Sequence, residues 1–138
     1  MKVQVIRSNR KTIGLEVRAD ESVILRAPAV DEISDVEWKS ILGEFTERVN
    51  HFCKVMEVTV GRITIRNQKT RWGSCSSKGN VNFNYQLYYM PRELMDYVII
   101  HELSHRHHMN HSAEFWREVE KYCPAYRECR KKLRDYEI

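Results

Sequence analysis

Hydrophobic and polar residues alternate along three stretches of the chain, and a period of two is the pattern of a half-buried β-strand. These stretches are residues 2–28, 57–66 and 81–87. The first contains turn residues and stops at Pro28, so we expect an N-terminal hairpin within residues 1–30. Residues 67–80 are rich in Gly, Ser and Asn, which predicts a long loop between the last two strands.

Four other segments carry apolar residues at helical spacing. They are residues 31–53, 91–108, 112–122 and 126–136. Asp31 or Ser34 can cap the first helix, and Ser112 can cap the third. Gly43 inside the first helix weakens the prediction that it is unbroken. The second helix starts at Pro91, which suits a first turn, and it is apolar on nearly every side. A helix of this kind is typically buried within its domain.

The buried helix carries His101, Glu102 and His105 with the spacing H-E-x-x-H. Positions i and i+4 lie on one face of a helix, so the two imidazoles can share a metal ion. Glu102 lies about 100° round the helix and beside His105, where its carboxylate can reach a water on that metal. Zinc is the expected ion, because it accepts neutral imidazoles and leaves a fourth position for water.

A third ligand must come from the residues that follow this motif. His111 ranks first, because it lies beyond the predicted helix end near His108, where the chain can turn back towards the metal. His108 ranks second, because it lies about 10.5 Å along the helix axis from His101. A carboxylate from the next helix, Glu114 or Glu118, ranks third.

The composition fits one soluble globular domain over residues 1–138, with 42% hydrophobic and 30% charged residues. A net charge of +4 permits an acidic partner without requiring one. The four cysteines form no C-x-x-C pair, which argues against a zinc ribbon or a redox pair. We find no signal-peptide pattern and no membrane-spanning stretch, so we expect free thiols, no membrane partner and a cytoplasmic location.

Further motifs surround the H-E-x-x-H pattern. They are Thr70-Arg71-Trp72-Gly73-Ser74-Cys75-Ser76, Asn82, Asn110-His111-Ser112, Phe115-Trp116, and Cys123-Pro124 with Tyr126. Together, from about Arg62 to the C-terminus, they resemble the YgjP-like metallopeptidases, a family of predicted zinc-dependent hydrolases similar to the SprT and Wss1-type proteases. The resemblance implies one zinc ion held by His101, His105 and His111. It also implies that Glu102 is the catalytic acid/base.

We therefore expect an α+β, zincin-like single domain. A small antiparallel or mixed sheet with the R-W-G-S-C loop would occupy residues 57–88 and pack on the active-site helix. That helix and the C-terminal helices would occupy residues 91–138. The N-terminal hairpin, residues 1–30, would have a structural role.

The expected function is cleavage of a peptide or protein substrate by a metal-activated water, with Glu102 as general base. Candidate substrate contacts are Arg71, Trp72, Asn82 and Asn84. The strand 81–87 could pair with an extended substrate if it lies at a sheet edge. Cys75 is a weaker candidate nucleophile, because no base is identified for it.

Two other functions remain open from the sequence. One is a nucleic-acid-binding module with a structural zinc, in which the basic last helix contacts phosphates and Trp72 stacks on a base. A structural zinc, however, leaves Glu102 without a role. The other is a metal hydrolase that acts on a non-peptide substrate.

Overall fold

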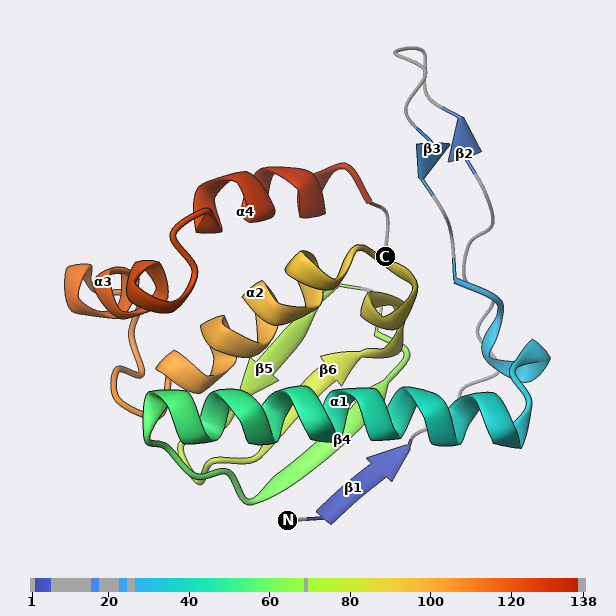
Figure 1. The fold of residues 1–138 in the computed structure, drawn as a ribbon, viewed down its shortest axis with the longest axis horizontal. Helices are drawn as coiled ribbons and strands as arrows, with labels where there is room; N and C mark the ends of the chain where they lie inside the picture. Colours follow the sequence, from blue (N-terminus) through green and yellow to red (C-terminus); the bar gives the residue numbers. More distant parts are fainter. Residues whose placement is uncertain (1, 6–15, 18–22, 25–26, 69, 137–138) are drawn as a thin grey trace.

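The computed structural model describes residues 2–5, 16–17, 23–24, 27–68 and 70–136. Along the chain, three short strands are followed by two helices, then by three further strands and four helices (Figure 1). In chain order they are β1 (Lys2–Val5), β2 (Glu16–Val17), β3 (Val23–Ile24), the 3-10 helix η1 (Val30–Glu32), α1 (Asp35–Met56), β4 (Arg62–Arg66), β5 (Gly73–Cys75), β6 (Val81–Asn84), the 3-10 helix η2 (Tyr85–Tyr89), α2 (Arg92–Ser104), α3 (Ala113–Tyr122) and α4 (Tyr126–Arg134).

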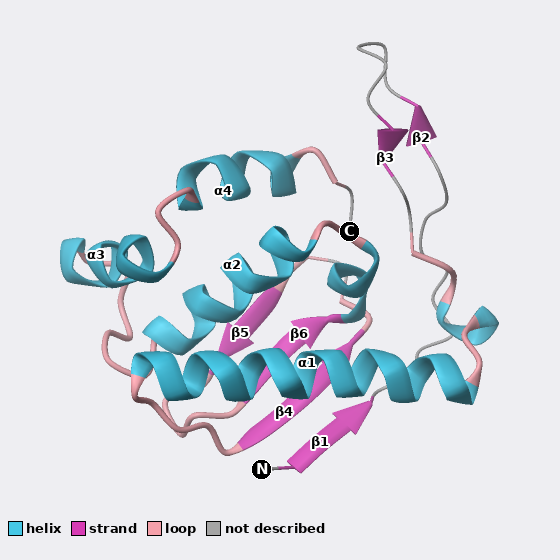
Figure 2. Cartoon of the chain, viewed as in Figure 1, coloured by secondary structure: helices cyan, strands magenta, loops and turns pink. Residues whose placement is uncertain are grey.

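The main sheet is mixed, with the strand order β1-β4-β6-β5 (Figure 2). Strands β1 and β6 run parallel to β4, whereas β5 runs antiparallel to β6. The expected mixed sheet is confirmed, but one detail of the prediction was wrong, because the segment 67–80 is not all loop and contains β5. Strand β6 lies inside the sheet, so the condition for its pairing with a substrate, a place at the sheet edge, is not met.

The strand predicted over residues 81–87 ends early, at Asn84. Its side-chain oxygen accepts a hydrogen bond from the backbone N–H of Gln86 at 3.0 Å and so caps the 3-10 helix η2. A side chain that forms a hydrogen bond with the nearby backbone in this way competes with the inter-strand backbone hydrogen bonds that would extend the strand. Strands β1 and β5 are the two edges of the sheet in the described part of the chain, and β5 is the edge next to β6.

The N-terminal hairpin is confirmed where the chain is described, because β2 and β3 pair antiparallel. The predicted turn between them lies outside the described residues. Strand β1 does not belong to this hairpin. It pairs with β4 through the register Val3↔Ile63 and Val5↔Ile65, which joins residues about sixty positions apart.

Helices α1 and α2 lie side by side on one face of the sheet, and α3 and α4 follow on α2 (Figures 1 and 2). Ser34 caps α1, since its Oγ accepts the backbone N–H of Glu37 at 3.1 Å. Gly43 does not interrupt this helix of 22 residues. The core between the layers is aromatic as well as aliphatic, and the rings of Phe45 and Phe83 stack at 5.7 Å between centroids.

Helix α2 is the central element of the molecule. It contacts the sheet, α1, α3 and α4, and its buried residues lie on nearly every side, as its sequence predicted. Pro91 precedes its first turn as the N-cap residue. None of the helices in the described part of the chain has the length and apolar content needed to cross a membrane.

Candidate metal and active site

The C-terminal end of α2 positions the first two histidines. The helix ends at Ser104, so the predicted end near His108 was wrong by four residues. The backbone N–H groups of His107 and His108 both donate to the carbonyl of Ser104, at 3.1 and 3.0 Å, which forms a tight turn instead. His105 still has helical dihedrals (φ −66°, ψ −14°), so it remains one turn from His101.

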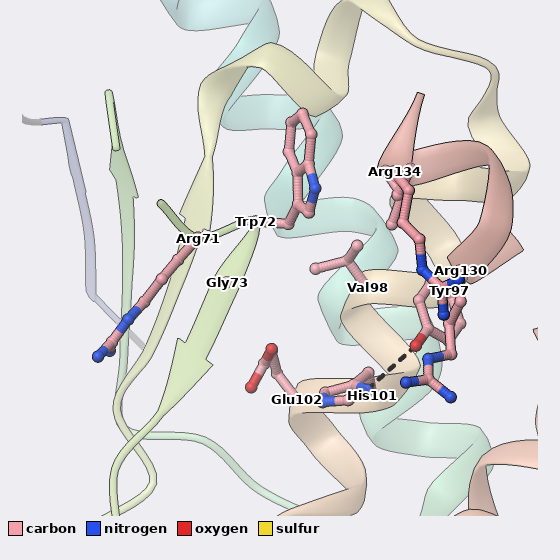
Figure 3. Close-up of a pocket in the computed structure, with 10 residues that line it drawn as sticks. Arg71, Trp72, Gly73, Tyr97, Val98, His101, Glu102, Arg130 and Arg134 are labelled. Carbon is pink, nitrogen blue, oxygen red and sulfur yellow. Dashed lines mark hydrogen bonds between the residues drawn. The ribbon is translucent and has the colours of Figure 1, made fainter. Parts of the chain in front are cut away.

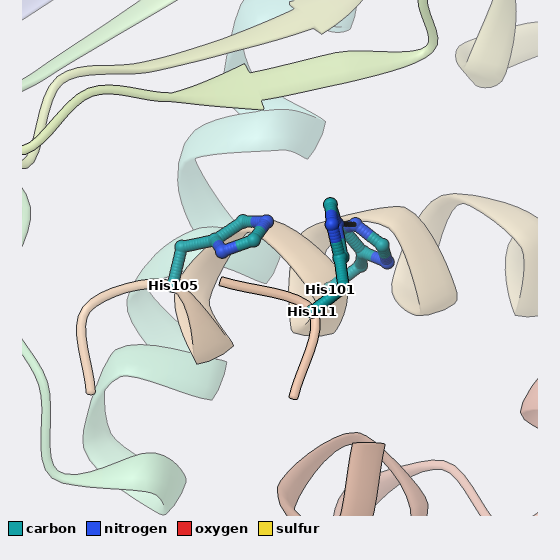
Figure 4. A group of neighbouring side chains, drawn as sticks. All are labelled: His101, His105 and His111. Atoms are coloured by element: carbon teal, nitrogen blue, oxygen red, sulfur yellow. Dashed lines mark hydrogen bonds between the residues drawn. The ribbon is translucent and has the colours of Figure 1, made fainter. Parts of the chain in front are cut away.

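The turn brings His111 back beside the two histidines of α2 (Figure 4). Each of the three imidazoles offers a nitrogen within 4.8 Å of the others, and the Nε2 atoms of His101 and His111 lie 3.3 Å apart. Two nitrogens of a tetrahedral zinc site, each about 2.0–2.1 Å from the ion, also lie about 3.3 Å apart. The donor set therefore fits a tetrahedral metal with three protein ligands.

Hydrogen bonds orient two of the imidazoles. The Nδ1 atom of His105 lies 3.0 Å from the backbone oxygen of His108, which can only accept, so Nδ1 carries the hydrogen. The Nδ1 atom of His101 lies 3.3 Å from the Tyr97 hydroxyl (Figure 3). Where Nδ1 donates, as it does in His105, the lone pair of Nε2 is available to a metal, and this is the usual arrangement in histidine metal sites.

The electrostatic environment keeps these imidazoles neutral. Burial, with a smaller contribution from the neighbouring His105 and His111, lowers the pKa of His101 to about 3. Burial also lowers the pKa of His105. Metals bind the neutral form of imidazole, so a site that resists protonation at neutral pH is suited to a cation.

Helix α3 supplies an aromatic wall behind the histidines. Its N-cap residue Ser112 accepts the backbone N–H of Phe115 at 3.2 Å, as the sequence predicted. Phe115 is fully buried, and its ring stacks on His105 at 4.5 Å between centroids. Trp116 stacks on the more exposed His111 at 5.9 Å. This packing restricts the rotamers of the imidazoles, a role that sequence spacing alone did not assign to Phe115.

Glu102 lies beside the histidines in a cavity of about 330 Å³ (Figure 3). Glu102 is buried, and burial raises the pKa of its carboxyl to about 8, whereas the positive charge of Arg71 acts to lower this pKa. The cavity is lined by Arg71, Trp72, Gly73, Tyr97, Val98, His101, Glu102, Arg130, Leu133 and Arg134. It lies between β5 on one side and α4 on the other, so the carboxylate faces a space that a substrate could enter.

Two of the four candidate substrate contacts, Arg71 and Trp72, line this cavity, and the other two do not. The amide of Asn82 accepts from Arg66 Nε at 2.8 Å and donates to Ser74 Oγ at 3.1 Å, which ties the strands together. The amide of Asn84 donates to two loop carbonyls, those of Gln68 at 3.0 Å and Arg71 at 3.2 Å. In the structure, both asparagines hold the framework of the R-W-G-S-C segment.

The lower-ranked metal ligands point elsewhere. His107 and His108 both face the carboxylate of Glu118, at 2.9 and 3.4 Å. Glu114 is exposed and faces Arg117. The thiol of Cys75 donates to the backbone oxygen of Ser76, and burial raises its pKa to about 11. The thiol therefore stays protonated at neutral pH and is a poor nucleophile.

Gly73 allows β5 to approach α2 closely. A Cβ atom there would lie 3.1 Å from Glu102 Cγ, 3.1 Å from Val98 Cγ1 and 3.0 Å from the Asn82 carbonyl. These contacts are too close for an undisturbed side chain, so Gly73→Ala should push Glu102 out of position. We expect the rate of peptide cleavage to fall about tenfold or more, because small displacements of a catalytic group are costly.

Gly43→Ala is the matched control for this change. Its Cβ would meet nothing within 4 Å on the exposed side of α1. It should leave cleavage unchanged and stabilise the fold by about 0.5–1 kcal/mol, since Ala is the better helix former. Equal cleavage rates for the Gly73→Ala variant and the unaltered protein would contradict the close approach of β5 to Glu102.

Comparisons with known proteins identify the family of this chain. The family model described as YgjP-like, metallopeptidase domain, matches residues 29–136. Among solved structures, the chain is similar to the metallopeptidase zymogen abylysin of Pyrococcus abyssi, with 27% identity and a TM-score of 0.60 over 64% of this chain and 90% of that one. No curated protein matches it.

Two further structures share the fold. The metallopeptidase zymogen jannalysin of Methanocaldococcus jannaschii has 23% identity and a TM-score of 0.58, over 66% of this chain and 94% of that one. Wss1 of Saccharomyces cerevisiae has 12% identity and a TM-score of 0.59, over 95% and 91% of the two chains. The family match covers most of the chain, and we conclude that this protein belongs to the YgjP-like metallopeptidase family.

Proposed function

We propose that this metallopeptidase is a zinc enzyme, with His101, His105 and His111 as ligands of one ion. The proposal is supported by three imidazoles whose nitrogens lie within 4.8 Å of one another, with those of His101 and His111 at the spacing of a tetrahedral site. A zinc ion held there would supply a Lewis acid to a water molecule and to the substrate carbonyl. Three ligands leave a fourth position for these oxygens.

Glu102 is the general base in this proposal. Its carboxylate takes a proton from the attacking water and then delivers it to the leaving amine. It is the one acidic side chain lining the cavity among the described residues, and it is buried next to the histidines. Burial favours its protonated form, whereas a cation at the neighbouring imidazoles favours the ionised form. These opposed effects suit a group that must both accept and release a proton.

The free edge of β5 offers a place for an extended peptide. One side of β5 pairs with β6, and the other is not paired with any strand of the described chain. A substrate strand added there would pass Gly73, which lies directly over Glu102. This arrangement favours a peptide over other hydrolysable substrates.

The cluster of three imidazoles, one of which lines the same cavity as the buried carboxylate of Glu102, carries the proposal. A structural zinc would close its fourth position with another protein ligand. The cluster of possible ligands found among the described residues contains only the three histidines. The nucleic-acid-binding alternative therefore has less support.

The test is metal-dependent cleavage of an unfolded protein. We expect the zinc-loaded chain to generate new N-termini from denatured casein, to lose this activity on treatment with phenanthroline, and to recover it when zinc is restored. Cleavage that survives complete removal of metal would contradict the proposal. DNA binding with a steep salt dependence, from a zinc-loaded chain that cleaves nothing, would favour the binding module.

A further inference from the structure

The cavity beside the histidines has a second wall, on α4, to which the proposed chemistry gives no role. Figure 3 places Arg130 and Arg134 on this side and Trp72 and Glu102 on the other, with Val98 between them. The two arginines are four positions apart, so they lie on one face of α4. Leu133 adds an apolar surface to the same wall.

These two guanidinium groups have no carboxylate partner among the described residues. The ion pairs found there engage other arginines instead: Arg48 with Asp96, Arg92 with Glu44, and Arg117 with Glu114. Arg130 and Arg134 are exposed to the cavity and the solvent. They therefore remain available to an anionic group of a ligand.

Packing holds one of them in place. The guanidinium of Arg130 lies 4.5 Å from the ring centroid of Trp116, which in turn stacks on Tyr126 at 5.3 Å. A cation held over an aromatic face loses less freedom when it binds a ligand. Arg130 is thus positioned beside the metal site before any substrate arrives.

The shape and lining of the cavity suit one class of side chain. Its volume of about 330 Å³ equals that of about eleven liquid waters at ~30 Å³ each, so a side chain of the substrate fits in it with space to spare. Trp72, Tyr97 and Val98 provide apolar contacts near the histidines, and the arginines provide positive charge at the outer side. A short aliphatic stem that ends in a carboxylate matches both parts.

We propose that Arg130 and Arg134 bind a carboxylate of the substrate, so that the enzyme selects peptides with glutamate or aspartate next to the cleaved bond. Arginine suits this task, because its planar fork matches a carboxylate with two parallel hydrogen bonds. The same chemistry is offered by the C-terminal carboxylate of a short peptide. This inference rests on the proposed function, since it requires a peptide to enter the cavity. Arg71 is not part of the proposed pair, because its side chain extends away from α4 (Figure 3).

The experiment compares fluorogenic peptides that carry Glu, Gln or Lys in turn at each position flanking the cleaved bond, with free or amidated C-termini. We expect kcat/KM to be about tenfold higher for the best Glu peptide than for its Gln counterpart. The double variant Arg130→Glu/Arg134→Glu should reverse this preference and favour Lys.

The double variant Arg127→Glu/Lys131→Glu is the matched control. It makes the same change in net charge on the same helix, but neither residue lines the cavity. It should keep the preference of the unaltered protein for Glu. An equal loss of preference in both double variants would show that only the overall charge matters, and would overturn the proposal.

A binding measurement separates this inference from the proposed function. The anisotropy of labelled peptides is measured with the Glu102→Gln variant, so that the peptides stay intact. If the Glu peptide binds more tightly and this depends on Arg130 and Arg134, the inference is supported even when no peptide is cleaved. In that case, the absence of cleavage contradicts only the proposed function.

The remaining outcomes are equally informative. Equal affinity and equal cleavage for Glu and Gln peptides overturn the inference while leaving the peptidase assignment intact. A preference for a free over an amidated C-terminus, lost in the Arg130→Glu/Arg134→Glu variant, supports the arginines and identifies the C-terminal carboxylate as the source.

Discussion

Replacing Glu102 with Gln is expected to lower kcat for peptide hydrolysis by about 10²–10⁴-fold while the metal stays bound. Glutamine has nearly the same shape as glutamate but can neither accept the proton of the attacking water nor deliver one to the leaving amine. The three histidines are untouched, and two of them keep their orienting bonds to Tyr97 and to the carbonyl of His108. The measurement is the initial rate of cleavage, with metal content determined on the same sample by mass spectrometry.

Glu114→Gln provides the control for this replacement. Glu114 lies in the first turn of α3, exposed and facing Arg117, and it shared the lowest rank among the candidate ligands with Glu118. Its loss should change neither metal content nor rate. If the Glu102→Gln variant turns over substrate at the undiminished rate with full metal occupancy, Glu102 is not the general base and another group must take that role.

The parts of this molecule that the sequence predicted well are those set by local geometry. The i, i+4 spacing of His101 and His105 fixes their shared face wherever a helix forms, and α2 forms because its apolar residues are buried from every side. The Ser34 and Ser112 caps also depend on neighbours three residues away. Such features need no knowledge of the rest of the fold.

The features that were missed depend on contacts between distant residues. Strand β5 has three residues with no alternating pattern, and it exists because it pairs with β6. Strand β1 was assigned to the hairpin, because nothing local reveals its parallel pairing with β4. The early end of α2 depends on the turn that follows Ser104. The next residues, 106–110, are polar apart from the exposed Met109, so a further helical turn would bury little apolar surface.

The α4 wall of the cavity was missed for the same reason. The sequence presents Arg130 and Arg134 as part of a basic, solvated helix face, and only the packing of α4 across α2 turns them towards Glu102. Tyr97 could have been found earlier, since it lies one turn before His101 and carries a hydroxyl. A systematic reading of the residues at i−4 from each predicted ligand would have identified it as an orienting group.

Replacing His111 with Ala is expected to abolish stoichiometric zinc binding and, with it, peptide hydrolysis. His111 is exposed and contributes little to the core, so the metal-free variant should unfold at nearly the same temperature as the metal-free parent. In the parent, zinc at 100 times its dissociation constant should stabilise the fold by about 2.7 kcal/mol, because it binds only the folded chain. The variant should lose most of this increase, and melting curves with and without zinc measure it directly.

His108→Ala is the control that separates the two candidates for the third ligand. His108 lies close in sequence, but its ring faces Glu118, 3.4 Å away, rather than the other histidines. Its backbone oxygen, which orients His105, survives the substitution. This variant should therefore keep both its zinc and its zinc-dependent melting temperature. If His108→Ala loses the metal while His111→Ala retains it, the geometry of three converging imidazoles is not the one that binds the ion, and the ligand set must be reassigned.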